Sequence, residues 1–131
     1  MRLLLDSHAF LWWLRDDTRL SRRARTAISA PTSVVFVSAA SIWEIAIKVS
    51  VGKVRWRERG GVALSDSIGA CGFTELAVTA RHAAAVRDLP RHHGDPFDRL
   101  LVAQALTEDL RVVTIDDAMA RYGVPVLPAD A

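Results

Sequence analysis

Short apolar segments alternate along this chain with segments of helical character, and this alternation constrains the fold more than any other feature. Strands are predicted at Arg2–Leu5, Val34–Val37, Phe73–Val78, Arg111–Ile115 and Val124–Leu127. Helices are predicted around residues 9–14 and 21–30, from Ser38 or Ser41 to about Val51, and over residues 62–71, 79–88, 95–109 and 116–122. Strands that are apolar throughout and separated by helices indicate a parallel sheet covered by helices on both faces.

The length and composition indicate one globular domain spanning residues 1–131. The chain has 131 residues, of which half are hydrophobic and 24% are charged, which is unlike a disordered chain. The single cysteine, Cys71, excludes an internal disulfide and a cysteine-rich zinc site. The net charge of +2 is too small to attract nucleic acid by itself. No apolar run approaches the ~18 residues of a membrane span, so we expect a cytoplasmic protein without a membrane partner.

Carboxylates follow two of the predicted strands. Asp6 comes directly after Arg2–Leu5, whereas Asp116 and Asp117 come after Arg111–Ile115. In open parallel sheets ligands bind outside the carboxyl ends of the strands, so these acids are candidates for a functional site. Aspartate is also a favoured N-cap for a helix that follows a strand, and capping remains an alternative role for Asp6.

Glu44 lies in an apolar helical segment, with no other acid between Asp17 and Glu58. A carboxylate in such surroundings is costly unless it is paired or binds a metal ion. Lys48 follows four residues later, and a solvated Glu44–Lys48 pair would stabilise the helix by ~0.2–0.5 kcal/mol. The residue pattern leaves a role in a site and a role in a surface ion pair equally open.

Asp98 is in phase with the apolar face of its predicted helix. Leu101, Val102, Ala105 and Leu106 follow it by three, four, seven and eight residues. This spacing places Asp98 on the buried face, at the N-terminal end. Asp95 is predicted to be the N-cap, followed by Pro96 at the first helical position. In the alternative role, the negative charge of Asp98 stabilises the helix by interacting with the positive end of its dipole.

Asp6, Glu44, Asp98 and Asp116 are therefore candidates for one shared acidic crevice. Clustered carboxylates cannot all remain ionised at neutral pH without a counter-charge. Mg²⁺ or Mn²⁺ supplies that charge and prefers oxygen ligands. Such a metal polarises a phosphoryl oxygen and activates water, so the chemistry indicates hydrolysis of a phosphodiester.

Four segments that contain these acids resemble the motifs of one known family. They are Leu3–Trp12, Ser38–Lys48 leading to Gly52-Lys53-Val54, His93–Ala105, and Val112–Asp116. In order and in content they resemble PIN-domain ribonucleases, specifically the VapC-type toxins of type II toxin–antitoxin pairs. The match covers nearly the whole chain. Each motif alone is moderately specific for this family, whereas four motifs in the family's order along the chain are highly specific.

The resemblance implies a three-layer α/β/α fold with a central five-stranded parallel sheet. It implies a metal-dependent endoribonuclease that uses Mg²⁺ or Mn²⁺ and hydrolyses RNA by metal-activated water, leaving a 5′-phosphate and a 3′-hydroxyl. It also implies a homodimer, and inhibition by a cognate VapB-like antitoxin in a hetero-oligomer.

The resemblance also assigns roles to the acids. Asp6 and Asp98 would hold the main metal, and Glu44 would bind it through water or orient the attacking water. Asp116 would support a second metal or the outer shell, although Asp117 is an alternative for this fourth position. Ser7 commonly lines the same pocket in the family.

Two other functions remain alternatives. A haloacid-dehalogenase-like phosphatase also has an aspartate after its first strand, but its chemistry needs a second aspartate two residues later, where this chain has His8. A catalytically inactive PIN-like binding module is the other alternative, against which the presence of all four acids argues.

Several histidines and tryptophans are assigned structural roles from their context. His92 and His93 are expected to be loop residues, with acid–base chemistry or phosphate contact as the alternative. His8 is expected to pack near the first helix. Trp43, with Trp12 and Trp13, is expected in the core or at an interface. Trp56, between two arginines, is a candidate for contact with RNA or antitoxin.

Overall fold

Five parallel strands form the single sheet of this protein. The computed structural model describes the backbone of residues 1–131 and all side chains except that of Arg59. The strands are β1 (Arg2–Leu5), β2 (Val34–Ser38), β3 (Thr74–Leu76), β4 (Arg111–Thr114) and β5 (Val126–Pro128). Their order in the sheet is β3-β2-β1-β4-β5, and every neighbouring pair is parallel. The predicted five-stranded parallel sheet is confirmed.

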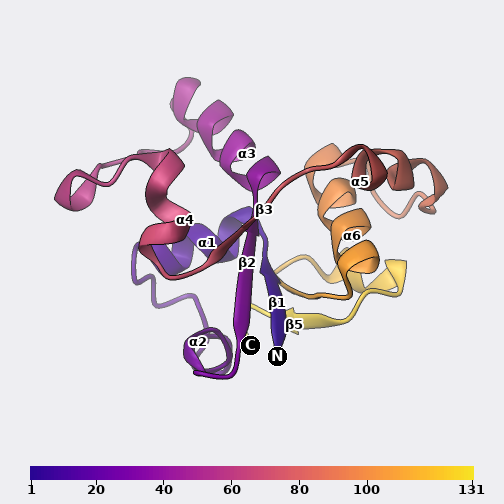
Figure 1. Cartoon of the computed structure of the whole chain (residues 1–131), viewed down its shortest axis with the longest axis horizontal. Helices are drawn as coiled ribbons and strands as arrows, with labels where there is room; N and C mark the ends of the chain where they lie inside the picture. The colour runs from indigo at the N-terminus through magenta and orange to yellow at the C-terminus, as the bar shows by residue number, and fades with distance from the viewer.

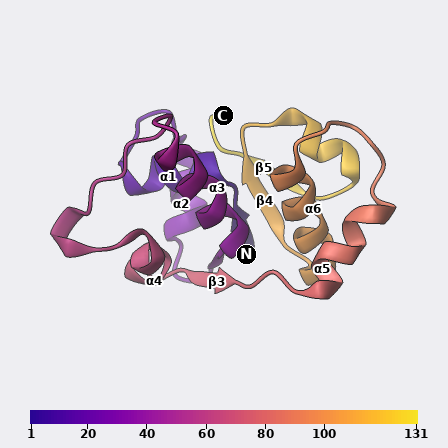
Figure 2. The same cartoon turned by 90° about the horizontal axis from the view of Figure 1, so that it is seen from above.

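Helices connect the strands and cover both faces of the sheet (Figures 1 and 2). The α-helices are α1 (Ser7–Leu14), α2 (Arg22–Ser29), α3 (Ala39–Ser50), α4 (Ser67–Ala70), α5 (Ala80–Ala85) and α6 (Pro96–Glu108). Short 3₁₀ helices lie at η1 (Arg59–Gly61), η2 (Leu64–Asp66), η3 (Val86–Asp88) and η4 (Asp117–Tyr122). None of the described helices has the length and apolarity needed to span a membrane.

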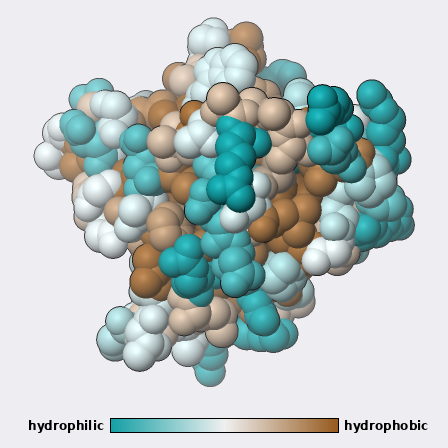
Figure 3. All heavy atoms as spheres, turned by 45° about the vertical axis from the view of Figure 1, so that its right-hand side comes forward, coloured by the Kyte–Doolittle hydropathy of each residue, from teal (hydrophilic) through white to brown (hydrophobic). Residues whose placement is uncertain are grey.

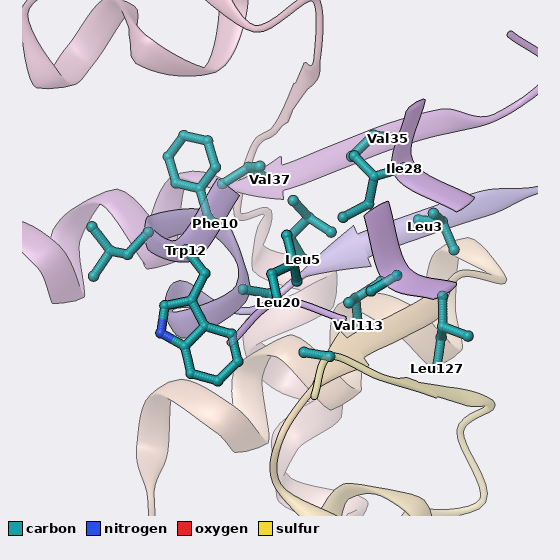
Figure 4. Close-up of a cluster of buried hydrophobic side chains, with 14 of the residues drawn as sticks. Leu3, Leu5, Phe10, Trp12, Leu20, Ile28, Val35, Val37, Val113 and Leu127 are labelled. Carbon is teal, nitrogen blue, oxygen red and sulfur yellow. The ribbon is translucent and has the colours of Figure 1, made fainter. Parts of the chain in front are cut away.

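The central strand β1 supplies side chains to two separate hydrophobic clusters. Leu3 and Leu5 pack with residues of α1 and α2, including Phe10 and Ile28 (Figure 4). Leu4 points to the opposite face and packs against α6 and η4. Because successive strand residues point to opposite faces, a strand covered on both sides must be apolar throughout, as Arg2–Leu5 is after its first residue.

The segment between α3 and β3 differs from the prediction. A continuous helix is predicted over residues 62–71, but the structure has the 3₁₀ turn η2 followed by the single-turn helix α4. Asp66, which precedes α4, makes no side-chain capping hydrogen bond. Gly69 lies inside α4, and glycine disfavours a helix interior by ~1 kcal/mol relative to alanine.

Two further boundaries differ because of local chemistry. The last strand begins at Val126 rather than at Val124. Pro125 has no backbone N–H for the sheet, and its carbonyl accepts from the Val112 amide at 2.9 Å. The segment after β4 is the 3₁₀ helix η4, whose N-cap is Asp116.

Candidate active site

The predicted acids gather at the carboxyl edge of the sheet, around β1 and β4. These two strands are neighbours, with Leu5 beside Val113. After β1 the chain builds the sheet outward to β2 and β3, and it then returns to add β4 and β5 on the other side. Asp6 follows β1 and Asp116 lies just beyond β4, so both flank the point where the direction of winding reverses, which is where ligands bind in such sheets.

Asp6 caps a helix and also belongs to the acidic cluster. Its Oδ1 accepts a hydrogen bond from the Ala9 amide at 2.8 Å, which makes it the N-cap of α1. The residue is only 4% exposed. Burial raises the pKa of the Asp6 carboxyl, and the Glu44 carboxylate raises it further, whereas hydrogen bonds from Thr114 and Ala9 and the charge of His8 lower it. The two roles considered for Asp6 therefore coexist.

Glu44 is buried at 8% exposure, although it is also paired with a lysine. Its Oε1 accepts from the Ser7 hydroxyl at 2.5 Å, and its Oε2 lies 3.0 Å from Lys48 Nζ. The ion pair considered from the sequence is present, but its carboxylate faces the protein rather than solvent. Ser7, at the start of α1, thereby joins the segment after β1 to α3.

Burial and the negative charges of all the other candidate acids act on the Asp98 carboxyl and raise its pKa. It lies in the first turn of α6, where Asp95 is the N-cap as predicted and accepts from the Phe97 amide at 2.9 Å. Burial, followed by the charges of Asp95, Asp6, Asp116 and Glu44, raises the pKa of Asp98 to about 8. The Coulomb energy of two charges grows as the distance between them falls, so the part of this shift that comes from Asp6, Asp116 and Glu44 indicates that all three approach the Asp98 carboxylate.

The geometry distinguishes Asp116 from Asp117. One oxygen of Asp116 caps η4 by accepting from the Ala118 amide at 2.9 Å. The other oxygen, Oδ2, faces the cluster and lies 3.3 Å from His93 Nε2. Asp117 is exposed in the first turn of η4, so Asp116 is the acid that turns towards the other carboxylates.

His93 enters the acidic cluster, which the sequence did not predict. Its Nε2 lies 3.3 Å from Asp116 Oδ2 and 3.9 Å from Asp98 Oδ2. Ligand atoms of these three residues all lie within 4.8 Å of one another. The position of His93, just before the helix that carries Asp98, was the signal that could have indicated it.

Two other predictions of side-chain environment are wrong in part. His8 is a residue of α1 and is exposed rather than packed, although its charge acts on the Asp6 carboxyl. Trp43 is 62% exposed, so it lies outside the buried core, and its place at an interface stays a prediction; Phe97 contacts it edge-on at 5.2 Å between ring centroids.

The donor set suits a hard divalent cation. Carboxylate oxygens are the ligands that Mg²⁺ and Mn²⁺ prefer. The burial of Asp6 and the raised pKa of Asp98 show that the cluster lacks compensating positive charge. A bound cation would compensate it, and oxygens of Asp98 and Asp116 lie within 4.8 Å of each other, close enough to share such an ion.

Comparison with known proteins identifies the family. The model of the PIN domain matches residues 3–125. The chain belongs to the PIN-domain family. It is also 31% identical over 130 residues to Ribonuclease VapC22 of Mycobacterium tuberculosis, covering 94% of this chain and 93% of that protein, so it is a PIN-domain protein of the VapC type.

Solved structures share the fold of this PIN-domain chain. VapBC2 from Rickettsia felis, bound to a promoter DNA fragment, superposes with a TM-score of 0.70 at 12% identity, over 97% of this chain and 98% of that one. FitAcB from Neisseria gonorrhoeae superposes with a TM-score of 0.66 at 18% identity, over 97% of each chain. At these identities the likeness establishes the α/β/α fold.

The raised pKa of Asp98 predicts how the metal-free PIN domain responds to pH. The pKa lies at about 8, against an ordinary value of 3.8. The protonated carboxyl therefore stabilises the folded state fully below pH ~4, and this stabilisation is lost as pH rises to ~8. We expect Asp98→Asn to raise the melting temperature by ~3 °C or more at pH 8, with the difference disappearing towards pH 4.

Thermal unfolding followed by circular dichroism in EDTA measures this effect. Asp117→Asn, at the exposed neighbouring acid, is the matched control and should leave the melting temperature unchanged at both pH values. Equal melting temperatures of wild type and Asp98→Asn at pH 8 would show that the ionised Asp98 carboxylate does not destabilise the folded state.

Proposed function

We propose that this VapC-type PIN domain is the toxin of a toxin–antitoxin pair and acts as an endoribonuclease dependent on Mg²⁺ or Mn²⁺. The observation that carries the proposal is the convergence of Asp6, Asp116 and Glu44 on Asp98, whose pKa is raised to about 8 by burial and by the charges of Asp95 and these three acids. The similarity to Ribonuclease VapC22 over almost the whole length supports RNA as the substrate. We propose further that residues 1–131 act as one domain in the cytoplasm, where RNA is available.

The residues of the site have separable roles in this proposal. Asp6 and Asp98 would hold the cation, and Asp116, which has an oxygen within 4.8 Å of an Asp98 oxygen, would support it. When bound, the cation supplies positive charge that stabilises the charge developing on the scissile phosphate and makes water a stronger nucleophile.

Glu44 is best suited to orient the attacking water. The Ser7 hydroxyl and Lys48 ammonium each engage one of its oxygens. Each carboxylate oxygen retains a lone pair after one such contact, so Glu44 can still accept a hydrogen bond from water. Because contacts from α3 and α1 both fix the carboxylate, it would hold the water in one defined orientation. Such positioning lowers the activation barrier of the reaction.

Substitution of the cation-holding acids tests the proposed activity. We expect Asp6→Asn and Asp98→Asn to reduce cleavage of a cellular RNA pool in Mn²⁺ by ~100-fold or more, since each removes a charge needed to hold the cation. Asp117→Asn should cleave like wild type, and EDTA should abolish cleavage by all. Equal cleavage by wild type and both variants would overturn the proposal. Release of inorganic phosphate from small esters without RNA cleavage would instead indicate a phosphatase.

A groove on the α1 side of the molecule supports the proposed antitoxin partner. It has a volume of about 630 Å³, and its apolar floor includes Leu11, Leu14, Trp56 and Cys71. Four basic residues line it, namely Arg15, Lys53, Arg55 and Arg57, and none of its described lining residues is acidic. A partner segment with both apolar and acidic side chains complements this surface, and we propose that the antitoxin supplies it.

Charge reversal in the groove tests this assignment. The double variant Arg55→Glu/Arg57→Glu should remain toxic when expressed alone, because it leaves the acids intact. It should escape neutralisation by the small protein encoded beside its gene, with the Kd of the complex raised by at least about tenfold. Arg22→Glu/Arg23→Glu on exposed α2 is the matched control and should be neutralised normally. Full neutralisation of the groove variant by that small protein would show that the antitoxin does not bind at this groove.

An exposed apolar stripe on α3 supports the proposed homodimer. Trp43, Ile47 and Val51 recur every four residues and therefore lie on one helix face. They are 62%, 39% and 61% exposed. Contiguous exposed apolar residues mark interaction surfaces. Figure 3, which views the molecule from the side of α5 and α6, shows further apolar patches among hydrophilic side chains. The stripe adjoins Phe97, next to Asp98, so a symmetric pairing here would place the acidic sites of both subunits near the interface.

A charged substitution at the end of the stripe tests the dimer. We expect Val51→Asp to shift the protein from dimer to monomer in size-exclusion chromatography with light scattering at micromolar concentration, because it would bury an unpaired charge. Thr26→Asp on α2 should remain dimeric. A monomeric wild type, or a dimeric Val51→Asp, would contradict an interface at this face.

A further inference from the structure

A buried hydrogen-bond network reaches the acidic cluster through His93. Tyr122 in η4 is the centre of this network. Its hydroxyl oxygen lies 3.2 Å from Arg99 Nη1, 3.3 Å from the His93 backbone nitrogen and 3.3 Å from His93 Nδ1. The far nitrogen of the same imidazole, Nε2, is the one beside Asp116.

The number of hydrogen-bond donors around the Tyr122 hydroxyl determines which group donates and which accepts in each of these bonds. Arg99 Nη1 and the His93 amide can only donate, so they occupy the two acceptor sites of the hydroxyl oxygen. The hydroxyl proton then remains for His93 Nδ1, which must accept it. Nδ1 therefore carries no proton, and the proton of the neutral imidazole is on Nε2.

Arg99 makes this arrangement rigid. It is only 9% exposed, and its guanidinium also donates to the carbonyls of Pro90 at 2.8 Å and Val86 at 3.3 Å. An arginine cannot be deprotonated in a protein, so its contribution as donor does not change. The same side chain thus joins α6 to the segment that leads into the His93 loop.

Two carboxylate oxygens lie near the Nε2–H group, and Asp116 Oδ2 at 3.3 Å is closer than Asp98 Oδ2 at 3.9 Å. Nε2 is shielded from solvent and has no aligned hydrogen-bond acceptor among the described residues. Asp116 Oδ2 lies 3.3 Å away, and a small rotation of the imidazole or of the carboxylate completes the bond. A nitrogen that carries a proton cannot ligate a cation, so the arrangement makes His93 a donor to the cluster and not a metal ligand.

We propose that Arg99 and Tyr122 hold His93 in the Nε2–H tautomer, so that His93 is a positioning residue that orients the Asp116 carboxylate. Its consequence for RNA cleavage rests on the proposed function, whereas the tautomer itself does not. Partners of this kind that orient carboxylates around a metal commonly change activity by 10–100-fold when they are removed.

Nuclear magnetic resonance of ¹⁵N-histidine-labelled protein tests the tautomer directly. Long-range ¹H–¹⁵N spectra at pH 8, without metal, should show His93 in the Nε2–H form, and addition of Mg²⁺ should leave it in that form. Tyr122→Phe removes the hydroxyl and should give a mixture of tautomers at His93. A wild-type protein with the proton on Nδ1, or a folded Tyr122→Phe with unchanged tautomer, would overturn the proposal. If Tyr122→Phe does not fold, the wild-type spectrum decides.

Two isosteric variants test the positioning role. The amide nitrogen of glutamine reaches the place of Nε2, whereas that of asparagine reaches the place of Nδ1. We therefore expect His93→Asn to lower kcat by about tenfold or more with little change in KM, and His93→Gln to restore kcat to within about threefold of wild type. Arg81→Gln, at an exposed position of α5, should leave kcat unchanged. Equal losses in both His93 variants would contradict positioning through Nε2. A protein without RNA cleavage under any condition would refute the proposed function while leaving the tautomer measurable.

Discussion

Repulsion between carboxylates at the carboxyl edge of β1 and β4 is the constraint on which the rest of this structure depends. Four acids approach one another there, and burial together with the neighbouring charges keeps Asp98 from ionising readily. The protein compensates only part of this charge. Lys48 pairs with Glu44, and the charge of His8 acts on Asp6. A fold that keeps these side chains together in spite of the repulsion is organised for a ligand that brings positive charge.

The scaffold holds the acids through elements that cannot move independently. Strand β1 lies between the two hydrophobic clusters, with Leu4 in one and Leu5 in the other. Asp6 follows it immediately and is fixed again by capping α1. On the opposite side of the cluster, Arg99 and Tyr122 connect α6, η4 and the loop of His93. The positions of the carboxylates are therefore set by packing, by backbone hydrogen bonds to Asp6 and Asp116, and by the side chains of Ser7 and Lys48 at Glu44, rather than by contacts among the acids themselves.

The sequence predicts the features that depend on local pattern. The apolar run Arg2–Leu5 predicts a central strand, and the spacing from Asp98 to Leu101 and Val102 predicts a carboxylate on the buried helix face. The broken helix around Gly69 and the 3₁₀ form of η4 depend on local energies that are nearly balanced, so the pattern does not decide them. His93 depends on Tyr122, which is 29 residues away in the chain, and no local signal reveals such a pairing. Glu44 is intermediate, because its apolar surroundings were visible while the contact with Ser7 was not.

Proton release on metal binding tests most directly whether the acids form one cation site. A carboxyl group with a pKa of about 8 is largely protonated at pH 7, and it must lose its proton to bind a cation. Calorimetric titration with Mn²⁺ at pH 7, in buffers of different ionisation enthalpy, should show about one proton released per cation bound by wild type. Asp98→Asn should bind more weakly and release almost none. Binding without proton release, or equal binding by wild type and Asp98→Asn, would contradict a shared site built around Asp98.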